Sequence, residues 1–291
     1  LLYEKYEAAM LSRGYKRKSK GFQYVKEYDE VKNSGDEPLQ VKQKFPQAII
    51  AVDANRVRGI TKLKKDNQDL QVIILDDAFQ HRKVNTEFNI ILIDYNRPLH
   101  TDHLLPWGRL RDNKSQIKRA EIVIVTKCPK DLQPVDLRMI SKYTGLKPYQ
   151  QLFFTSLEYG EKEPVFPDIE FPEILEGKGS LSVTGIAAPN IFLNYVEKNF
   201  GSTTPLIFPD HHNFTRSDIQ NICKKARNMA LILTTEKDKI RLQQWKDSIP
   251  DDIKAKFFYI PIKVKFLKDE DKFTKIIYEY VKTNKGNSRL Y

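Results

Sequence analysis

Cysteine is scarce in this sequence, and its scarcity argues against two kinds of stabilising site. Cys128 and Cys223 are the two cysteines among 291 residues, and they lie far apart without C-x-x-C spacing. A disulfide framework needs paired cysteines, and a structural zinc site needs clustered cysteine or histidine ligands. The sequence indicates neither, and a reducing cytosolic compartment fits it best.

Long hydrophobic runs are also missing. No apolar stretch reaches the roughly 18 residues that a membrane-spanning helix needs, so we expect any membrane contact of these residues to be peripheral. The chain starts at Leu1 rather than Met, and residues 1–7 read as the end of a helix that runs into a strand. We expect from this that an N-terminal segment is missing.

Positive charge, by contrast, is in excess. The formal net charge is +11, which favours anionic partners such as a nucleotide, a phosphorylated substrate, an acidic membrane surface or nucleic acid. Charge alone does not choose among them. The hydrophobic content of 40% is ample for a buried core, so the chain is expected to be a folded protein of about two domains.

The apolar runs predict the fold class. Continuous rather than alternating hydrophobicity suggests strands that are buried on both faces, as in a parallel sheet covered by helices. We therefore predict a doubly wound α/β domain over residues 1–150. Its predicted strands end in polar or acidic residues and are 48–53 (AIIAVD), 72–77 (VIILDD), 89–95 (NIILIDY) and 121–127 (EIVIVTK).

Residues 151–291 are predicted to form a smaller α/β domain. A strand over 149–159 leads into it, and an amphipathic helix over 271–282 is expected to pack back on the first domain. Between them we predict further strands at 181–186, 205–208, 230–235 and 256–266.

Residues 72–81 (VIILDDAFQH) carry the strongest chemical signal. Apolar residues deliver Asp76 and Asp77 to the carboxyl edge of a parallel sheet, where ligands bind and where phosphoryl-transfer enzymes hold Mg²⁺ with an aspartate. Side chains alternate along a strand, so the two acids are expected to diverge. Gln80 and His81 follow one turn later, and the bland alternative is a strand that ends in a polar turn.

Two acidic motifs are ambiguous when taken alone. In FPDHHNFT (208–215), Asp210 beside His211 suggests a carboxylate–imidazole pair, although a solvated helix start explains it equally well. In GDEP (35–38), two acids open a helix, and a simple capping device is the favoured interpretation.

Three further segments are less specific. LLPWGRLRD (104–112) places arginines, which suit phosphate recognition, before a helix, and it can equally be a surface loop. The basic loop 12–21 (SRGYKRKSKG) is either solvated or in contact with phosphate or an anionic headgroup; nucleic acid is the weaker choice because few aromatics are interleaved. TTEKDKIRL (234–242) reads mainly as a helix cap.

Taken in order, these pieces resemble the tetraacyldisaccharide 4′-kinase family. Motifs in the family's order span nearly the whole chain, which is far more specific than any single one. The matching segments are SRGY (12–15), GDEP (35–38), DDAFQH (76–81), LLPWGRLRD (104–112), TGIAAP (184–189), FPDHHNFT (208–215) and TTEKD (234–238).

The resemblance implies a P-loop NTPase-like parallel-sheet domain joined by a two-strand linker to a smaller α/β domain. It implies transfer of the γ-phosphate of ATP, with Mg²⁺, to the 4′-hydroxyl of an acylated glucosamine disaccharide 1-phosphate. The expected setting is the cytoplasmic face of a Gram-negative inner membrane, with a peripheral membrane contact and no nucleic acid.

Site residues carry over by motif. Asp36 resembles the catalytic aspartate, and His211, with Asp210 beside it, resembles the histidine paired with it from the other domain; this overrules the capping interpretation of GDEP. The remaining carried-over residues are Asp76, Asp77 and Gln80 for magnesium, and Arg13, His81, Arg111 and Asp112 for nucleotide or substrate.

Several features depart from the family pattern. Ala78 replaces a usual glycine, Asp112 a usual glutamate and Arg109 a usual proline, which puts a direct metal contact of Asp112 in doubt. The phosphate-binding motif G-x-x-x-x-G-K-[ST] does not occur in the sequence. As it stands, the chain is expected to bind ATP poorly and turn over little; a non-catalytic relative that binds anionic lipid or nucleotide, and a P-loop enzyme with a soluble substrate, remain alternatives.

Overall fold

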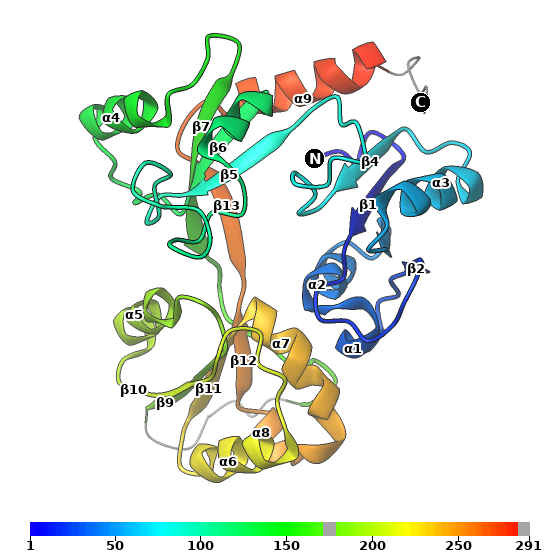
Figure 1. Ribbon diagram of the computed structural model, residues 1–291. Coiled ribbons are helices and arrows are strands. Elements are labelled where there is room, and N and C mark those ends of the chain that lie inside the picture. The colour runs from blue at the N-terminus through cyan, green and yellow to red at the C-terminus, as the bar shows by residue number, and fades with distance from the viewer. Residues whose placement is uncertain (171–178, 285–291) are drawn as a thin grey trace.

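The computed structural model describes residues 1–170 and 179–284. In these ranges the chain forms three sheets (Figure 1). Two four-stranded sheets and their helices make up what we call the first lobe, and a five-stranded sheet with its helices makes up the second lobe. The mixed α/β architecture with parallel sheets confirms the predicted fold class.

The first sheet has a parallel core in the order β2-β3-β1-β4, with β2 antiparallel at one edge. Apolar residues of β1 and β3 pack on the amphipathic helix α3, where Leu11, Ala51 and Leu63 are fully buried. Its elements are β1 (Ala8–Ser12), β2 (Gln23–Tyr24), α1 (Val31–Ser34), α2 (Asp36–Lys44), β3 (Ile49–Val52), α3 (Arg56–Asp66) and β4 (Val72–Leu75).

The second sheet, in the order β13-β7-β6-β5, completes the first lobe. Its strands β5, β6 and β7 are parallel, and β13 is antiparallel to β7. Ile277 of α9 packs with Ile122, Ile124 and Phe153, so the last helix lies on this sheet. The elements are β5 (Ile90–Asp94), η1 (Lys114–Arg119), β6 (Ile122–Thr126), α4 (Pro134–Thr144), β7 (Gln151–Tyr159), β13 (Ile262–Phe266) and α9 (Glu270–Asn284).

The five-stranded sheet of the second lobe has the order β10-β9-β11-β12-β8, and all strands but β8 are parallel. Leu181, Ile222, Ile232 and Phe257 are fully buried in its main core. The elements are β8 (Glu163–Pro164), β9 (Ser180–Thr184), α5 (Pro189–Phe200), β10 (Thr203–Ile207), α6 (Arg216–Ala226), β11 (Leu231–Thr235), α7 (Glu236–Leu242), η2 (Gln243–Ser248), α8 (Asp251–Lys254) and β12 (Phe257–Ile260).

Two strands connect the lobes. In Figure 1, β7 (green) leads from the first lobe toward the second and β13 (orange) leads back. Thr155–Tyr159 and Ile262–Phe266 form an antiparallel ladder, which is the two-strand linker that the family resemblance implied. The chain therefore returns after the second lobe, and α9 ends against the first.

Three local predictions were wrong. Residues 1–7 contain a turn, not a helix end, in which the Leu2 carbonyl accepts the N–H groups of Lys5 and Tyr6. The strand expected at 256–266 is divided at Pro261 into β12 and β13, which belong to different sheets, because proline has no N–H to continue the ladder. The strands β4 and β5 are not buried on both faces: Ile74 is 45% and Leu92 66% exposed, since each strand is at the edge of its sheet among the described strands.

Candidate active site

The carboxyl ends of β3 and β4 are tied together by a buried arginine. The Arg56 guanidinium donates to the carbonyl of Asp53 at 2.6 Å and to that of Asp76 at 2.8 Å. Parallel strands of one sheet end at the same edge, so this one side chain fixes the positions of the ends of β3 and β4, which lie on either side of β1. The acids that follow β4 therefore start from a rigid frame.

Asp76 and Asp77 point to different partners. The Ser12 hydroxyl donates to Asp76 Oδ2 at 2.9 Å, and Arg111 donates to both oxygens of Asp77 at 3.0 and 2.5 Å. Burial raises the pKa of Asp76, helped by the negative charges of Glu37 and Asp77, whereas the Arg111 hydrogen bonds lower the pKa of Asp77. The divergence expected from strand alternation is thus present in the structure.

The other residues that the sequence predicts for this edge are held less firmly by the surrounding protein. Gln80 and Arg13 are exposed, although Arg13 is close enough to Asp77 to contribute to its lowered pKa. The buried His81 Nε2 has no hydrogen-bond partner within the described part of the chain. Asp112 pairs with Arg82 at 3.2 Å, and the Asn113 N–H, which donates to its Oδ1, and this pairing lower the pKa of its carboxyl.

The GDEP motif opens α2 directly beside this edge. Gly35 has a φ of 89°, and a Cβ there would lie 3.2 Å from the Tyr15 carbonyl and 3.3 Å from Gly14 Cα, so only glycine fits without displacement. The Gly14 N–H reaches Ser12 Oγ at 3.4 Å, which links this turn to the Ser12–Asp76 hydrogen bond. The close turn carries the next residue, Asp36, to the start of the helix.

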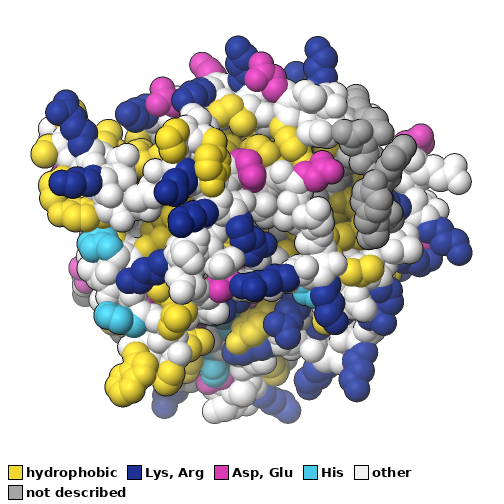
Figure 2. All heavy atoms as spheres, turned by 45° about the horizontal axis from the view of Figure 1, so that its top comes forward, with side chains coloured by type: hydrophobic (Ala, Val, Ile, Leu, Met, Phe, Trp, Pro, Cys, Tyr) yellow, Lys and Arg dark blue, Asp and Glu magenta, His cyan; other side chains and the backbone are white. Residues whose placement is uncertain are grey.

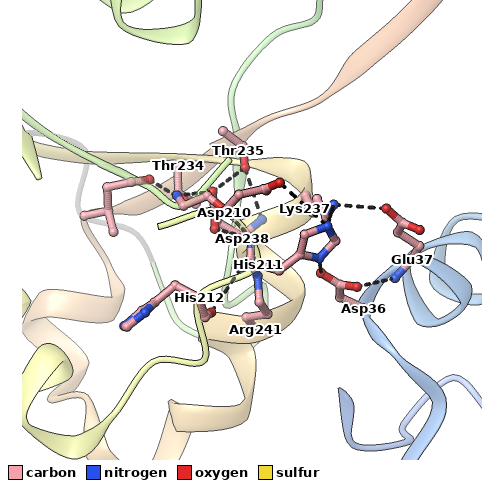
Figure 3. Close-up of polar contacts among 12 residues, drawn as sticks. Asp36, Glu37, Asp210, His211, His212, Thr234, Thr235, Lys237, Asp238 and Arg241 are labelled. Carbon is pink, nitrogen blue, oxygen red and sulfur yellow. Dashed lines mark hydrogen bonds and ion pairs between the residues drawn. The ribbon is translucent and has the colours of Figure 1, made fainter. Parts of the chain in front are cut away.

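Asp36 is paired across the lobes. Its side chain is nearly buried, at 5% exposed, and Oδ2 lies 2.9 Å from Nδ1 of His211 (Figure 3). Its Oδ1 accepts the N–H of Glu37 at 3.0 Å, so the carboxylate also satisfies one free donor of the helix start. Asp36 therefore combines the capping role read from the sequence with a contact to the second lobe.

His211 takes Asp36, not its sequence neighbour, as its close partner. Asp210 Oδ2 lies 3.9 Å from His211 Nε2, beyond hydrogen-bond distance. His211 has a φ of 55° and Asp77 a φ of 44°, a left-handed conformation that non-glycine residues rarely adopt. Such outliers are enriched at functional sites; in the described residues Lys16, Lys127 and Asp269 also have a positive φ.

The TTEKD motif does more than cap α7. Thr235 does accept the Asp238 N–H as the cap. In addition, the buried Asp238 accepts from the Gly185 N–H at 3.0 Å and from Arg241 at 2.6 Å, and Arg241 donates to the carbonyls of Gly185 and His212. This network holds the loop that carries His211.

Lys237 of the same motif was missed as a site residue. Its Nζ lies 3.0 Å from His211 Nε2 and 3.0 Å from Glu37 Oε1 (Figure 3). The sequence signal was present in the motif, but the cap interpretation was sufficient to explain it. The contact depends on residues 26 and 200 positions away, which no local pattern reports.

The residues at the β4 edge fit a magnesium–nucleotide site better than a metal site built from protein alone. Within residues 1–170 and 179–284, no group of three or more His, Cys, Asp or Glu side chains could hold a metal ion. Mg²⁺ in nucleotide sites needs only one or two carboxylates beside substrate phosphates and water. The partly buried Asp76, whose charged form is disfavoured by burial and by neighbouring acids, is a carboxylate that a cation would stabilise.

An acid–imidazole pair that joins two α/β lobes, next to acids at a parallel-sheet edge, is compatible with phosphoryl transfer, which uses a base for the acceptor and carboxylates for the metal. The chain is thus placed in the class of kinases. Comparison with known proteins makes the class specific. The tetraacyldisaccharide-1-P 4′-kinase model matches residues 1–282, and the chain belongs to this family.

Proteins similar to this one match all or nearly all of its residues. The tetraacyldisaccharide 4′-kinase of Phocaeicola vulgatus is 44% identical, over all of this chain and 82% of its own, and that of Porphyromonas gingivalis (strain W83) is 43% identical, over 94% and 78%. A crystal structure of LpxK from Aquifex aeolicus in complex with ATP is similar with a TM-score of 0.68 and 28% identity, covering 95% of this chain and 80% of that one.

Proposed function

We propose that this protein phosphorylates the 4′-hydroxyl of a tetraacyldisaccharide 1-phosphate with ATP, in the synthesis of a lipid A precursor. The observation that carries the proposal is the 2.9 Å contact between Asp36 and His211, which come from different lobes. The family and the names of its relatives supply the substrate, and the ATP complex of the Aquifex aeolicus relative supports the phosphoryl donor.

In the proposed reaction, Asp36 acts as the base. Its carboxylate takes the proton of the 4′-hydroxyl while the hydroxyl oxygen bonds to the γ-phosphorus of ATP. The bond between the γ-phosphorus and the β–γ bridging oxygen breaks, and ADP leaves. Because Asp36 is nearly buried and hydrogen-bonded to His211, it is held in one orientation toward the acceptor.

Asp76 and Asp77 are the residues that would hold magnesium, with Gln80 beside them. A bound Mg²⁺ would neutralise charge on the transferred phosphates. We assign Arg111 and Arg13 to phosphate contact because a guanidinium donates two hydrogen bonds in one plane. His81, with its unpartnered buried nitrogen, and Asp112 complete the proposed nucleotide and substrate group.

The lipid substrate implies work at a membrane surface, and we propose the cytoplasmic face of the inner membrane. None of the helices in the described ranges has the length and apolar character to span a bilayer. The net charge of +11 favours an anionic surface, and Figure 2 shows many Lys and Arg side chains among hydrophobic ones on one face of the molecule.

Transfer of ³²P from ATP to tetraacyldisaccharide 1-phosphate tests the proposal. It is measured with this chain and with the chain extended by any residues encoded upstream of Leu1, since the phosphate-loop motif is not among the 291 residues. We expect Asp36→Ala to lower kcat by about a thousandfold, the scale of a lost general base, with lipid binding retained.

Full turnover of Asp36→Ala would reject the assignment of the base. Salt-sensitive liposome binding without any transfer in the extended protein would instead support a non-catalytic relative. A matched control is Asp66→Ala, an exposed acid of α3 that pairs with Lys62 and is expected to leave kcat unchanged.

A further inference from the structure

Two segments of the first lobe expose large apolar side chains. In the loop between β5 and η1, residues 95–113, Trp107 is 91% and Leu105 63% exposed. On α4, Val135, Met139 and Tyr143 are 59%, 47% and 52% exposed, and their spacing of four residues places them on one face of the helix. Single apolar residues on a surface need no explanation, but a contiguous group of them marks an interaction site.

Contacts between the loop and α4 join these side chains into one surface. The His100 ring stacks on Tyr143 with 4.6 Å between ring centroids, and Lys114 Nζ donates to the His100 carbonyl at 3.2 Å. In Figure 1, α4 and the loop that follows β5 lie on the same side of the first lobe. We call this group the apolar surface, and it consists of Leu105, Trp107, Val135, Met139 and Tyr143.

The loop presents Trp107 on a closed turn. Asp102 Oδ1 accepts the N–H groups of His103 at 2.8 Å and of Arg109 at 3.0 Å, so one carboxylate closes the turn. A Cβ on Gly108 would collide with the His103 carbonyl, so the turn also requires glycine there. The exposure of Trp107 is therefore a property of a defined backbone geometry.

Positive charge surrounds the apolar surface. Among the acids of the two segments, Asp102 is engaged in the loop turn and Asp136 accepts the Gln133 N–H at 3.0 Å in the α4 cap. Anionic lipid headgroups attract cations, and Trp and Tyr side chains favour the membrane–water interface. An anionic bilayer thus fits this surface in both charge and polarity. Exposed cations on the two segments and just after α4 include Arg109, Lys114, Arg138, Lys142 and Lys147.

The same loop reaches the candidate active site. Beyond Trp107 it continues to Arg111, which donates to Asp77 at 3.0 Å, directly after β4. A bilayer that holds the tip of the loop therefore lies close to the sheet edge that we assign to phosphate and metal. This continuity favours a bilayer over a protein partner, because the proposed acceptor is itself a lipid.

We propose that the apolar surface docks on an anionic bilayer, with the Trp107 ring at the level of the headgroups. The proposal assigns the peripheral membrane contact to named residues. Binding of the bilayer concerns the surface alone. Its consequence, that docking brings the sheet edge to an acylated substrate, rests on the proposed function.

Tryptophan fluorescence tests the docking without any turnover. The chain has two tryptophans, and Trp245→Phe leaves Trp107 as the reporter. With vesicles of phosphatidylcholine and phosphatidylglycerol that contain no disaccharide, we expect the Trp107 emission to shift to the blue and its quenching by acrylamide to fall. An unchanged emission on vesicles that bind the protein would overturn the proposal.

Vesicle flotation of the 291-residue chain measures the contribution of the side chains. The double variant Leu105→Ala/Trp107→Ala is expected to lower the partition coefficient at least about tenfold, because it removes two side chains that the bilayer would bury. The matched control is Tyr28→Ala, which removes another 91% exposed aromatic, between β2 and α1, and should have no effect. Equal losses in the two variants would reject the assigned surface.

The basic residues are tested by the lipid composition. Arg138→Gln and Lys142→Gln should each weaken binding to phosphatidylglycerol-containing vesicles by about fivefold at low salt, the scale of one cation near an anionic surface. Both variants should bind pure phosphatidylcholine vesicles as the wild type does. Losses that do not depend on phosphatidylglycerol would contradict the charge complementarity.

Two further outcomes separate this proposal from other readings. A dimer in sedimentation without vesicles that Trp107→Ala abolishes would assign the surface to a second copy and overturn the proposal. If phosphate is transferred but vesicle binding does not depend on Trp107, the docking surface fails and the proposed function stands. If binding depends on Trp107 and no phosphate is transferred, the docking surface stands and the proposed function fails.

Discussion

The two lobes contribute to the site in opposite ways. On the second lobe, the carboxylate of Asp238 is fully buried and accepts three hydrogen bonds, from Gly185, Thr235 and Arg241. On the first lobe, Asp77 is 56% exposed in its side chain and is held by a single arginine. Asp238 thus accepts hydrogen bonds from three protein residues, whereas Asp77 accepts them from Arg111.

This difference separates a framework from a binding surface. A buried network of several hydrogen bonds is rigid because breaking any one of them leaves a buried polar group unpaired, which is costly, and this network fixes the loop that carries His211. An exposed acid with one partner retains free lone pairs, and it can exchange that partner for a cation or donor on a ligand. The structure thus concentrates orientation on the second lobe and ligand capacity on the first.

The largest effect that separates the two acids is expected in stability. Asp238→Ala should lower the free energy of unfolding by about 3–5 kcal/mol, because it leaves the buried Arg241 without its carboxylate. Asp77→Ala, the matched change on the first lobe, should cost less than about 1 kcal/mol, as expected for an exposed pair. Urea unfolding followed by circular dichroism measures both, and equal losses would contradict the contrast.

A smaller effect is expected at Asp77 and Arg111, where we propose that the first lobe binds its ligand. Arg111→Met should lower kcat/KM roughly tenfold to a hundredfold, the scale of a lost hydrogen bond to a charged group at about 1.5–3 kcal/mol. It should also raise the pKa of Asp77, because Arg111 is the main cause of its lowered value. A lowered pKa keeps Asp77 ionised as pH falls, so without Arg111 the acid limb of the pH–rate profile should move to higher pH.

The control for this variant lies on the same face. Arg82→Met removes the partner of Asp112, which is more weakly paired at 3.2 Å, and leaves Asp77 intact. An acid limb that moves equally in both variants would show that general surface charge, and not the Arg111–Asp77 pair, sets the profile.

The smallest effect is expected where the lobes meet away from the site. Lys44→Met removes the ion pair with the buried Glu236 and should lower stability by about 1 kcal/mol, since Lys44 is half-exposed. Burial opposes the charge of Glu236, but the Lys44 hydrogen bond and the Ile262 N–H bring its pKa below the usual range.

The pH dependence of this contribution has a definite sign. A lowered pKa in the folded state stabilises the protein above the unfolded pKa, and the stabilisation is lost as pH falls through the folded value. The stability difference between wild type and Lys44→Met should therefore shrink on acidification. A difference that grows at low pH would contradict this origin.

The sequence predicted the α/β architecture better than it predicted which strands pair and which side chains contact one another. The strands around β1, β3 and β6 were predictable because buried parallel strands are continuous apolar runs that end in polar residues. The break at Pro261 was also readable in principle, but the apolar run on both sides concealed that its halves join different sheets. The edge exposure of β4 and β5 was not readable at all, since pairing is not a local property.

In the candidate site, too, residues that follow a strand were easier to predict than contacts between residues far apart in the sequence. Asp76 and Asp77 follow a strand and were found from the residues alone, whereas Asp36 read as a helix cap until the family resemblance was considered. Taken alone, its motif suggested that His211 pairs with its sequence neighbour Asp210; the resemblance implied Asp36, which lies 175 residues away and is its partner in the structure. Lys237 was explained by its position in a capping turn and so attracted no other role.

The sequence by itself determined the elements, the class of enzyme and the acids at the sheet edge, because hydrophobic periodicity, strand ends and ordered motifs are recorded in neighbouring residues. Only the tertiary structure decided the other contacts of these groups: that Lys237 lies at the second ring nitrogen of His211, that Asp210 stays beyond hydrogen-bond distance of it, and that Arg111 holds Asp77. Hydrogen bonds act over about 3 Å in space, and the packing of two lobes, not distance along the chain, sets which atoms come that close.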